Sequence, residues 1–337
     1  MGPWRDFVEE SLTVTIARTI FPKLVPKSIS RNFRAVGDTE LESLMPMLTR
    51  YTLNHYGKDI THTEEFEECI RNHLWLRLNN SRIKVVPWLN AARPLRASRI
   101  LEIGCGTGSS SVALAEQGAR VTALDIDGTA LEFAKQRASL YGLEVDFHEA
   151  NAIEVDELFR GEHYDWIIFY ATLEHMTFSE RIVAMRKTWE MLSPGDNWCV
   201  IETPNRLWFY DGHTSQLPFY HWLPDDLAQD YCKFSPRTAF RELSTDLERD
   251  LGPELARWGR GLSYHEFDLS MKPAELLNVV SCLDDFWGIY NIAAKWKKLI
   301  WDRGLIDRRY ESLLRHIRPD IHKGFFKSWL NLIIRKN

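Results

Sequence analysis

The chain has 337 residues, of which 45% are hydrophobic and 26% are charged, as in an ordinary soluble globular protein with a sizeable core. Its formal net charge of −5 argues against a dedicated nucleic-acid-binding protein, which is usually basic overall. The 5 cysteines are scattered and form no C-x-x-C pair, so we expect no disulfide framework, no zinc site and a reducing, cytoplasmic setting. We also expect no signal peptide and no membrane span, which would need about 18 consecutive apolar residues.

Residues 1–95 precede the first clear strand and are predicted to form a helical extension or lid. Residues 8–24 have an amphipathic helical pattern. Phe66, Ile70 and Leu74 recur at helical spacing and predict a second helix just before the core. The remaining residues, 96–337, are predicted to form the main domain.

Residues 99–108 contain a short apolar strand that is followed by three closely spaced glycines, Gly104, Gly106 and Gly108. Glycines at this spacing let the backbone turn sharply and approach a ligand. An Ala- and Ser-rich helix follows, and then a second strand that ends at Asp125, where a carboxylate is placed to accept hydrogen bonds from a ribose diol. A dinucleotide fingerprint would need its third glycine at position 109, which is Ser109. The spacing therefore disfavours a nicotinamide-dependent oxidoreductase.

With the acid Glu102 before it, this G-x-G-x-G loop resembles motif I of the class I S-adenosylmethionine-dependent methyltransferases, among them type 11/12-like enzymes that methylate hydroxyl groups of small molecules or glycans. The resemblance implies that S-adenosyl-L-methionine is the cofactor, that the loop passes its methionine moiety and that Asp125 binds its ribose. A structural glycine turn in another α/β sheet is the alternative. The residues expected to bind the cofactor are Glu102, Gly104, Cys105, Gly106, Gly108, Asp125, Ile126, Asn151, Ala152 and Tyr170.

The core continues as alternating strands and helices, which predicts a parallel sheet covered by helices. The expected strands are 144–149, 164–170 and 198–202, and the expected helices are 129–141 and 178–192. Asn151 follows the third strand, where the resemblance implies a polar side chain on the adenine amino group. A turn-forming role for Asn151 is the alternative.

Residues 203–224 combine aromatic residues, histidines and prolines in a segment too rich in helix and strand breakers to be one element. A connection of this length is usually functional or a lid. We therefore expect residues 204–260 to form an acceptor-binding loop and a helical insertion, with Trp208, Tyr210 and His221 binding the acceptor. An apolar anchor for a subdomain is the alternative.

Methyl transfer from a sulfonium is an in-line displacement, so the protein must align donor and acceptor and remove the proton of a hydroxyl acceptor. Imidazole titrates near neutral pH, and His213 and His175 are the candidate bases. Glu174 or Asp211 is expected to orient either ring.

Glu174-His175 also resembles the end of the Glu-x-x-Glu-His magnesium site of quinone-pathway O-methyltransferases. Ala171 replaces the first acid of that pattern, which puts the magnesium site in doubt. A divalent ion held by Glu174, His175, Asp211 and His213 is an alternative that the sequence does not favour, and we predict no metal.

The C-terminal part is predicted to complete the sheet. Residues 262–269 alternate and predict the sixth strand, 273–280 predict a helix, and the apolar, β-branched run 329–335 predicts the seventh strand. The resemblance implies a Rossmann-like α/β sheet of order 3-2-1-4-5-7-6 with strand 7 antiparallel. Residues 285–301 predict an amphipathic helix docked on its own domain, with peripheral contact to a membrane as the alternative.

These observations predict an S-adenosylmethionine-dependent O-methyltransferase that acts on a small molecule, sugar or glycolipid and uses a histidine base. Methylation of carbon or nitrogen is the nearest alternative. A catalytically silent cofactor-binding module that works through its terminal extensions is an alternative from another class. The sequence identifies neither the acceptor nor the oligomeric state.

Overall fold

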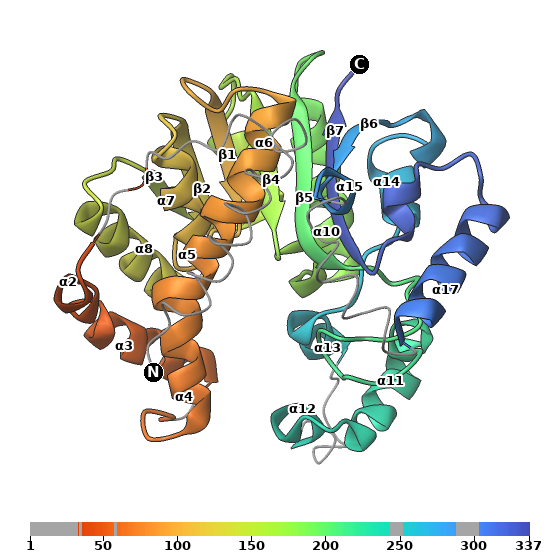
Figure 1. The fold of residues 1–337 in the computed structure, drawn as a ribbon, viewed down its shortest axis with the longest axis horizontal. Helices are drawn as coiled ribbons and strands as arrows, with labels where there is room; N and C mark the ends of the chain where they lie inside the picture. Colours follow the sequence, from red (N-terminus) through yellow and green to blue (C-terminus); the bar gives the residue numbers. More distant parts are fainter. Residues whose placement is uncertain (1–32, 34–35, 57–58, 243–251, 288–302) are drawn as a thin grey trace, which may run out of the picture. The chain divides into compact units, whose positions relative to one another are not determined.

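A computed structural model describes residues 33, 36–56, 59–242, 252–287 and 303–337. The described strands form a seven-stranded sheet of order β3-β2-β1-β4-β5-β7-β6, which confirms the predicted order (Figure 1). The chain divides into two compact units, residues 1–150 with 283–297 and residues 151–282 with 298–337. The predicted helix at 8–24 and most of the predicted helix at 285–301 lie outside the described residues.

The first unit contains the three parallel strands β1 (Arg99–Ile103), β2 (Arg120–Asp125) and β3 (Asp146–Glu149). Their register sets Ile103 beside Leu124 and Asp125 beside Glu149. The glycine loop and Asp125 therefore follow neighbouring strands at the same edge, where ligands of open α/β sheets bind.

Helices surround these strands in the first unit, and α3 packs against α8 while α5 packs against α7 (Figure 1). The helices that precede β1 form an almost continuous series interrupted by two π-helical segments, η1 and η2. The helical segments of this unit are α2 (Asp38–Glu42), α3 (Met45–Tyr56), α4 (Glu64–Ile70), η1 (Arg71–Leu76), α5 (Arg77–Asn80), η2 (Ser81–Val85), α6 (Val86–Ala92), α7 (Ser109–Ala115), α8 (Gly128–Leu140) and α15 (Leu283–Phe286).

The second unit contains β4 (Trp166–Tyr170), β5 (Asn197–Pro204), β6 (Asn278–Cys282) and β7 (Trp329–Arg335). β4 and β5 are parallel, whereas β7 is antiparallel to both β5 and β6, as predicted. The register of β5 against β7 shifts between Val200 and Thr203, where Glu202 has a φ of +52°. This bulge lies at the end of β5 from which the aromatic segment leaves.

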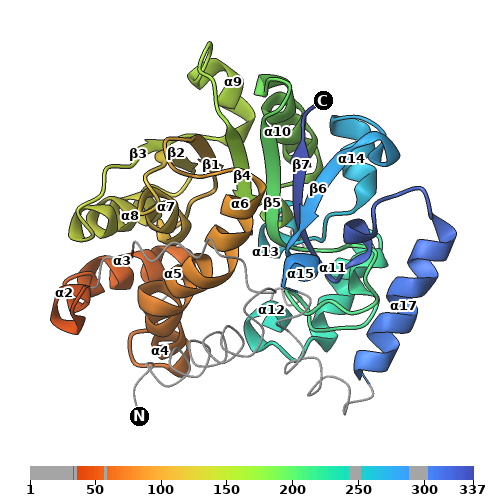
Figure 2. The ribbon, with the colours of Figure 1, turned by 45° about the horizontal axis from the view of Figure 1, so that its top comes forward.

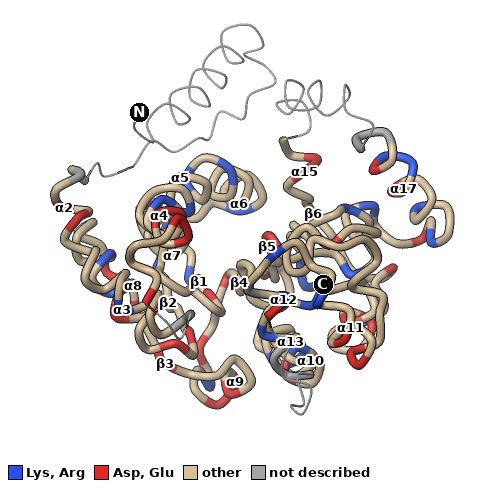
Figure 3. Tube along the Cα trace, turned by 90° about the horizontal axis from the view of Figure 1, so that it is seen from below, with Lys and Arg blue, Asp and Glu red and all other residues tan. Residues whose placement is uncertain are grey.

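Among the helices of the second unit, α10 packs against α14 and α11 packs against α13 (Figure 2). Acidic residues occupy the first turn of α11, as they do in α4 of the first unit, where they complement the positive end of the helix dipole (Figure 3). The helical segments are η3 (Ala152–Glu154), α9 (Val155–Leu158), η4 (Leu173–His175), α10 (Phe178–Met191), η5 (Tyr220–Trp222), α11 (Asp225–Tyr231), η6 (Cys232–Phe234), α12 (Thr238–Glu242), α13 (Gly252–Trp258), α14 (Tyr264–Ser270), η8 (Ala274–Leu276), α17 (Arg303–Ile317) and η9 (Lys323–Phe326).

The sixth strand predicted at 262–269 is wrong, because these residues form α14 and the strand is β6. Ser263 begins the helix through a capping box, in which its backbone N–H donates to Glu266 Oε2 at 3.0 Å and its hydroxyl at 2.7 Å. Tyr264 and Phe267 are buried at helical spacing, so the apolar residues that alternate along the sequence face one side of a helix. The helix predicted at 273–280 is instead the short turn η8 followed by the start of β6.

All 5 cysteines are buried. Among the described residues, no helix is long and apolar enough to cross a bilayer.

Gly108 immediately precedes α7 and lies against Ala134 of α8. Its φ is +72°, and a Cβ added there would lie 2.8 Å from Ala134 Cβ on α8. Gly161 has a φ of +81° with no atom within 4 Å of an added Cβ. The two positions therefore share the backbone cost of a side chain but differ in the space available.

We expect Gly108→Ala to lower the free energy of unfolding by about 1–3 kcal/mol more than Gly161→Ala, because only the first substitution overpacks a helix contact. Urea titrations of the two variants provide the measurement. Equal losses would show that the contact of the loop with α8 does not constrain residue 108.

Candidate functional site

The glycine loop is fastened to the end of β2 by backbone hydrogen bonds and by one carboxylate. The N–H groups of Gly104 and Cys105 donate to the Leu124 carbonyl at 2.8 and 3.1 Å. Asp125 Oδ2 accepts from Gly106 N at 2.7 Å, and Oδ1 accepts from Asp127 N at 2.9 Å. Burial raises the pKa of Asp125, and these N–H donors oppose that shift. Asp125 therefore fixes the shape of the loop as well as facing the position predicted for a ribose.

Glu102 lies beneath the loop and is fully buried. Its carboxylate accepts hydrogen bonds from the hydroxyls of Ser110 and Ser111, the second at 2.5 Å, and so braces the start of α7. Burial raises the pKa of Glu102 to about 7, against the lowering effect of the two hydroxyls. In this structure Glu102 supports the loop from inside, and its predicted direct contact with the cofactor stays a prediction.

The N-terminal helices hold the other side of the loop, a contact that the sequence reasoning did not assign. His73 Nδ1 on η1 lies 3.0 Å from Thr107 Oγ1, and the His73 ring packs edge-on against Tyr51 of α3. The fully buried guanidinium of Arg137 donates to the carbonyls of Thr107 and His73. Burial lowers the pKa of Arg137 to about 9. An arginine among the apolar residues of the buried face of α8 is the sequence signal for this link.

Tyr51 belongs to the same side of the site. Burial raises its pKa to about 12, with smaller contributions from the charges of Arg77, Asp127 and Asp125. The π-helical segment η1, which carries His73, is a type of helix distortion that is frequent at functional sites.

The other predicted cofactor residues differ in their accessibility. Ile126 is 63% exposed although it directly follows the buried strand β2. Cys105 is buried, which raises the pKa of its thiol. In the second unit, Asn151 Oδ1 accepts from Ile153 N at 3.2 Å and caps η3, which is the turn-forming role, and Ala152 is buried. Tyr170 lies half-buried at the end of β4.

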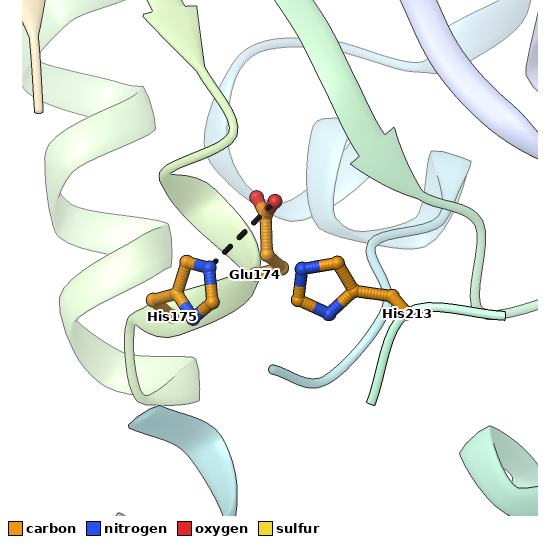
Figure 4. A group of neighbouring side chains, drawn as sticks. All are labelled: Glu174, His175 and His213. Carbon is orange, nitrogen blue, oxygen red and sulfur yellow. Dashed lines mark ion pairs between the residues drawn. The ribbon is translucent and has the colours of Figure 1, made fainter. Parts of the chain in front are cut away.

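Three of the predicted catalytic side chains in the second unit come together. Glu174 and His175 belong to η4, directly after β4, and His213 belongs to the segment after β5. The His175 and His213 rings lie with their centroids 5.3 Å apart, and His175 Nε2 is 4.0 Å from Glu174 Oε1 (Figure 4). Burial raises the pKa of Glu174 to about 8. Burial and the neighbouring His175 lower the pKa of His213 to about 4.

Arginines tie this group of residues to the inserted helices. The buried guanidinium of Arg181 donates to Leu173 O at 2.9 Å and Arg260 O at 2.8 Å, and pairs with Glu266 of α14. Arg257 of α13 donates to the His175 carbonyl at 3.0 Å. These bonds fix the backbone of η4, which is only three residues long and makes few hydrogen bonds within itself.

Asp211, the fourth predicted catalytic residue, bonds to its own segment and to His221. It accepts from the backbone N–H groups of His213, Thr214 and Ser215, and its Oδ1 lies 3.2 Å from Nε2 of the buried His221. Burial raises the pKa of Asp211, but the His221 ring and the backbone donors outweigh it and hold that pKa well below its usual range. Asp211 therefore shapes the segment and does not orient His175 or His213.

The predicted acceptor-binding residues lie mainly inside the segment. His221 is buried, and its Nδ1 accepts from Gly261 N at 3.3 Å. Trp208 is buried against Tyr310 of α17, with ring centroids 5.4 Å apart. Tyr210 forms an isolated bridge with Pro218. Of the aromatic residues in this segment, Phe219 and Trp222 are the large exposed ones.

The buried Glu102 predicts a stability that depends on pH. A raised pKa in the folded state means that this group favours folding fully below the unfolded value, near 4.5, and loses that contribution as pH rises through about 7. We expect the free energy of unfolding to fall by about 3 kcal/mol over this range from Glu102 alone. Glu102→Gln should flatten this slope.

Thermal melts of the parent and of Glu102→Gln between pH 4.5 and pH 8 provide the measurement. If the melting temperatures of the two proteins depend on pH in the same way, the pKa of Glu102 is not raised in the folded state and the prediction is wrong.

Comparisons with known proteins find similarity to methyltransferases. A family model described as "Methyltransferase domain" matches residues 100–195. The ubiquinone biosynthesis O-methyltransferase of Brucella anthropi is 35% identical over 106 residues, which are 32% of this chain and 41% of that protein. The cypemycin N-terminal methyltransferase of a Streptomyces species is 34% identical over 117 residues, which are 33% of this chain and 44% of that protein. The chain thus spans less than half the length of these relatives.

Among solved structures, the magnesium protoporphyrin IX methyltransferase from Synechocystis PCC 6803 with bound S-adenosylmethionine has a TM-score of 0.36 and 21% identity, over 52% of this chain and 80% of that chain.

Proposed function

We propose that this chain, in which residues 100–195 form a class I S-adenosylmethionine-dependent methyltransferase domain homologous to small-molecule methyltransferases, transfers a methyl group to a small-molecule acceptor. The observation that carries the proposal is the glycine loop fastened to Asp125 within the matched region. Glycines without side chains allow the backbone of the loop to approach a ligand closely. The Asp125 carboxylate lies next to the loop, at the carboxyl ends of the strands, where ligands of open α/β sheets bind.

Asp125 is able to bind a ribose while it holds the loop. Its oxygens accept the N–H groups of Gly106 and Asp127, and an ionised carboxylate has about four acceptor positions in all. The exposed Ile126 side chain offers an apolar surface next to it for an adenine ring. Both features support the assignment of these residues to the methyl donor.

The acceptor proposed here is a hydroxyl group of a small molecule, sugar or glycolipid. In the reaction the methyl carbon leaves the sulfonium sulfur and forms a bond to the acceptor oxygen, and the hydroxyl proton goes to an imidazole. His213 is the first choice of base and His175 the second. One of the matched relatives is named as an O-methyltransferase and the other as a methyltransferase of an amino terminus, so methylation of nitrogen or carbon stays the alternative.

Asp125→Asn is expected to weaken donor binding by about 10- to 100-fold, because it removes the charge that serves both the loop N–H and the ribose hydroxyls. Isothermal titration calorimetry with S-adenosylmethionine or S-adenosylhomocysteine measures this. Asp146→Asn, an exposed carboxylate on β3, is the matched control and should leave the affinity unchanged. Unaltered affinity in Asp125→Asn would remove the basis of the donor-site assignment.

His213→Ala is expected to lower kcat by about 100-fold or more for a hydroxyl acceptor without changing donor affinity, since a positioned base contributes rate and not donor binding. The measurement needs methyl-labelled donor and a panel of phenols, sugars, glycolipids and amines, with product identification.

Near-full turnover in both His213→Ala and His175→Ala would refute the acid–base assignment. Donor binding without turnover on any acceptor of the panel would instead support the silent cofactor-binding module.

A further inference from the structure

One ligand-type atom from each of Glu174, His175 and His213 lies within 4.8 Å of the corresponding atoms of the other two. Figure 4 shows the two imidazole rings turned edge to edge next to the Glu174 carboxylate. We propose that these three side chains bind one divalent transition-metal ion. The four-ligand ion site considered from the sequence included Asp211, which the structure removes, and the remaining three residues converge without it.

Glu174 contains a buried oxygen that lacks a protein partner. Its Oε2 accepts from Thr203 Oγ1 at 3.0 Å, whereas Oε1 has no hydrogen-bond donor among the described residues. The side chain is fully buried, and an acceptor left unsatisfied in such a place is unfavourable. Oε1 is the atom that faces His175 Nε2, at 4.0 Å. A cation between them would satisfy it.

The hydrogen bonds of both rings favour the tautomer that a metal ligand needs. His175 Nδ1 lies 2.8 Å from the Arg257 carbonyl, which only accepts, so Nδ1 carries the proton. Thr214 Oγ1 donates its single proton to the Gly259 carbonyl at 2.8 Å and therefore accepts from His213 Nδ1 at 2.9 Å. In each ring the lone pair is then on Nε2. An outer hydrogen bond from Nδ1 is the usual support of a metal-bound histidine.

The backbone around the three residues is also fixed. Arg237 donates to the carbonyl of His213 at 2.8 Å, and Arg257 donates to that of His175 at 3.0 Å. Gly259 leaves room for the His213 ring, because an added Cβ would lie 2.8 Å from His213 Nδ1. The surroundings thus hold the ligands in place from outside.

The distances require only a small closure. Ligands at about 2.0–2.1 Å from one ion lie about 3.0–3.5 Å apart, against the 4.0 Å between Glu174 Oε1 and His175 Nε2. The His175 side chain is 39% exposed, so its ring has space to move toward the buried carboxylate.

The described residues contain a second group of ligand-type side chains, His163, Asp165 and Asp196. It differs from the first group in that its buried carboxylate oxygen already has hydrogen-bond partners. Asp196 Oδ2 already accepts from Ser193 N at 3.0 Å and lies 3.0 Å from His163 Nε2. This group therefore has no buried oxygen in need of a cation, and it provides an internal control.

The ligand set indicates the kind of ion. Two imidazoles and one carboxylate suit zinc, iron or manganese, whereas magnesium prefers oxygen ligands. The site thus differs in chemistry from the carboxylate-rich magnesium site that the Glu174-His175 pair resembles. Three protein ligands leave coordination positions open for an acceptor oxygen.

A catalytic role for the ion rests on the proposed function. The binding of the ion to these three side chains does not depend on it. A bound divalent ion would lower the pKa of an acceptor hydroxyl and so take the place of the imidazole base. Ion binding is measured without donor or acceptor, so its failure leaves the methyltransferase proposal standing and the reverse also holds.

The test uses the full chain after chelation and dialysis, titrated calorimetrically with ZnCl2, MnCl2 and MgCl2, with Co²⁺ absorption as a spectroscopic measurement. We expect one equivalent of Zn²⁺ to bind at least 100-fold more tightly than Mg²⁺, a rough bound set by the imidazole ligands. Glu174→Gln and His213→Ala should each weaken Zn²⁺ binding by at least ~10-fold. Gly259→Ala should also weaken it, because the new Cβ displaces the His213 ring.

His163→Ala should bind Zn²⁺ like the parent. The proposal is overturned by sub-stoichiometric Zn²⁺ binding, by unchanged affinity in Glu174→Gln and His213→Ala, by an equal loss in His163→Ala, or by a Co²⁺ spectrum with thiolate bands, which would assign the ion to cysteine. Thermal melts establish that each variant is folded. If only one of Glu174→Gln and His213→Ala is folded, its Zn²⁺ affinity alone tests the proposal.

Discussion

The hydrogen bond from Gly106 N to Asp125 Oδ2 is the constraint on which the arrangement of the glycine loop depends. It joins the loop after β1 to the end of β2, so the shape of the loop follows from the parallel pairing of two strands. The same carboxylate accepts from Asp127 N, at the start of α8. One acidic side chain therefore helps to set the positions of a loop, a strand end and a helix start.

The sheet was predictable from the sequence because its signals are local. Gly104, Gly106 and Gly108 have positive φ values that few other residues tolerate, and the strand β4 is a continuous apolar run. The identity of the sixth strand was not predictable in this way. Tyr264 and Phe267 fit an alternating pattern as well as a helical one, and only the capping bond between Ser263 and Glu266 decides for the helix. The half-exposed β6 has a weak apolar signal.

The candidate site in the second unit was predictable as a set of residue types and not as an arrangement. Glu174-His175 follows a buried strand, which made it a candidate, and His213 was chosen for its place in an aromatic segment. Asp211 was chosen for the same reason, but its carboxylate is used by backbone N–H groups two to four residues along the chain. Short-range turn bonds of this kind compete with catalytic roles for an aspartate, and the residue pattern does not tell the two apart.

Arg137 has a consequence for how a ligand is exchanged at the glycine loop. Its buried guanidinium donates to backbone oxygens on both the loop and η1. Lifting the N-terminal helices off the loop would remove the His73 carbonyl from this cation, which would keep the Thr107 carbonyl and the Ser109 hydroxyl as acceptors. Arg137 loses a hydrogen bond to its buried guanidinium if the helices move, so we expect a ligand of the loop to exchange on the side of the exposed Ile126 while the helices stay in contact with the loop.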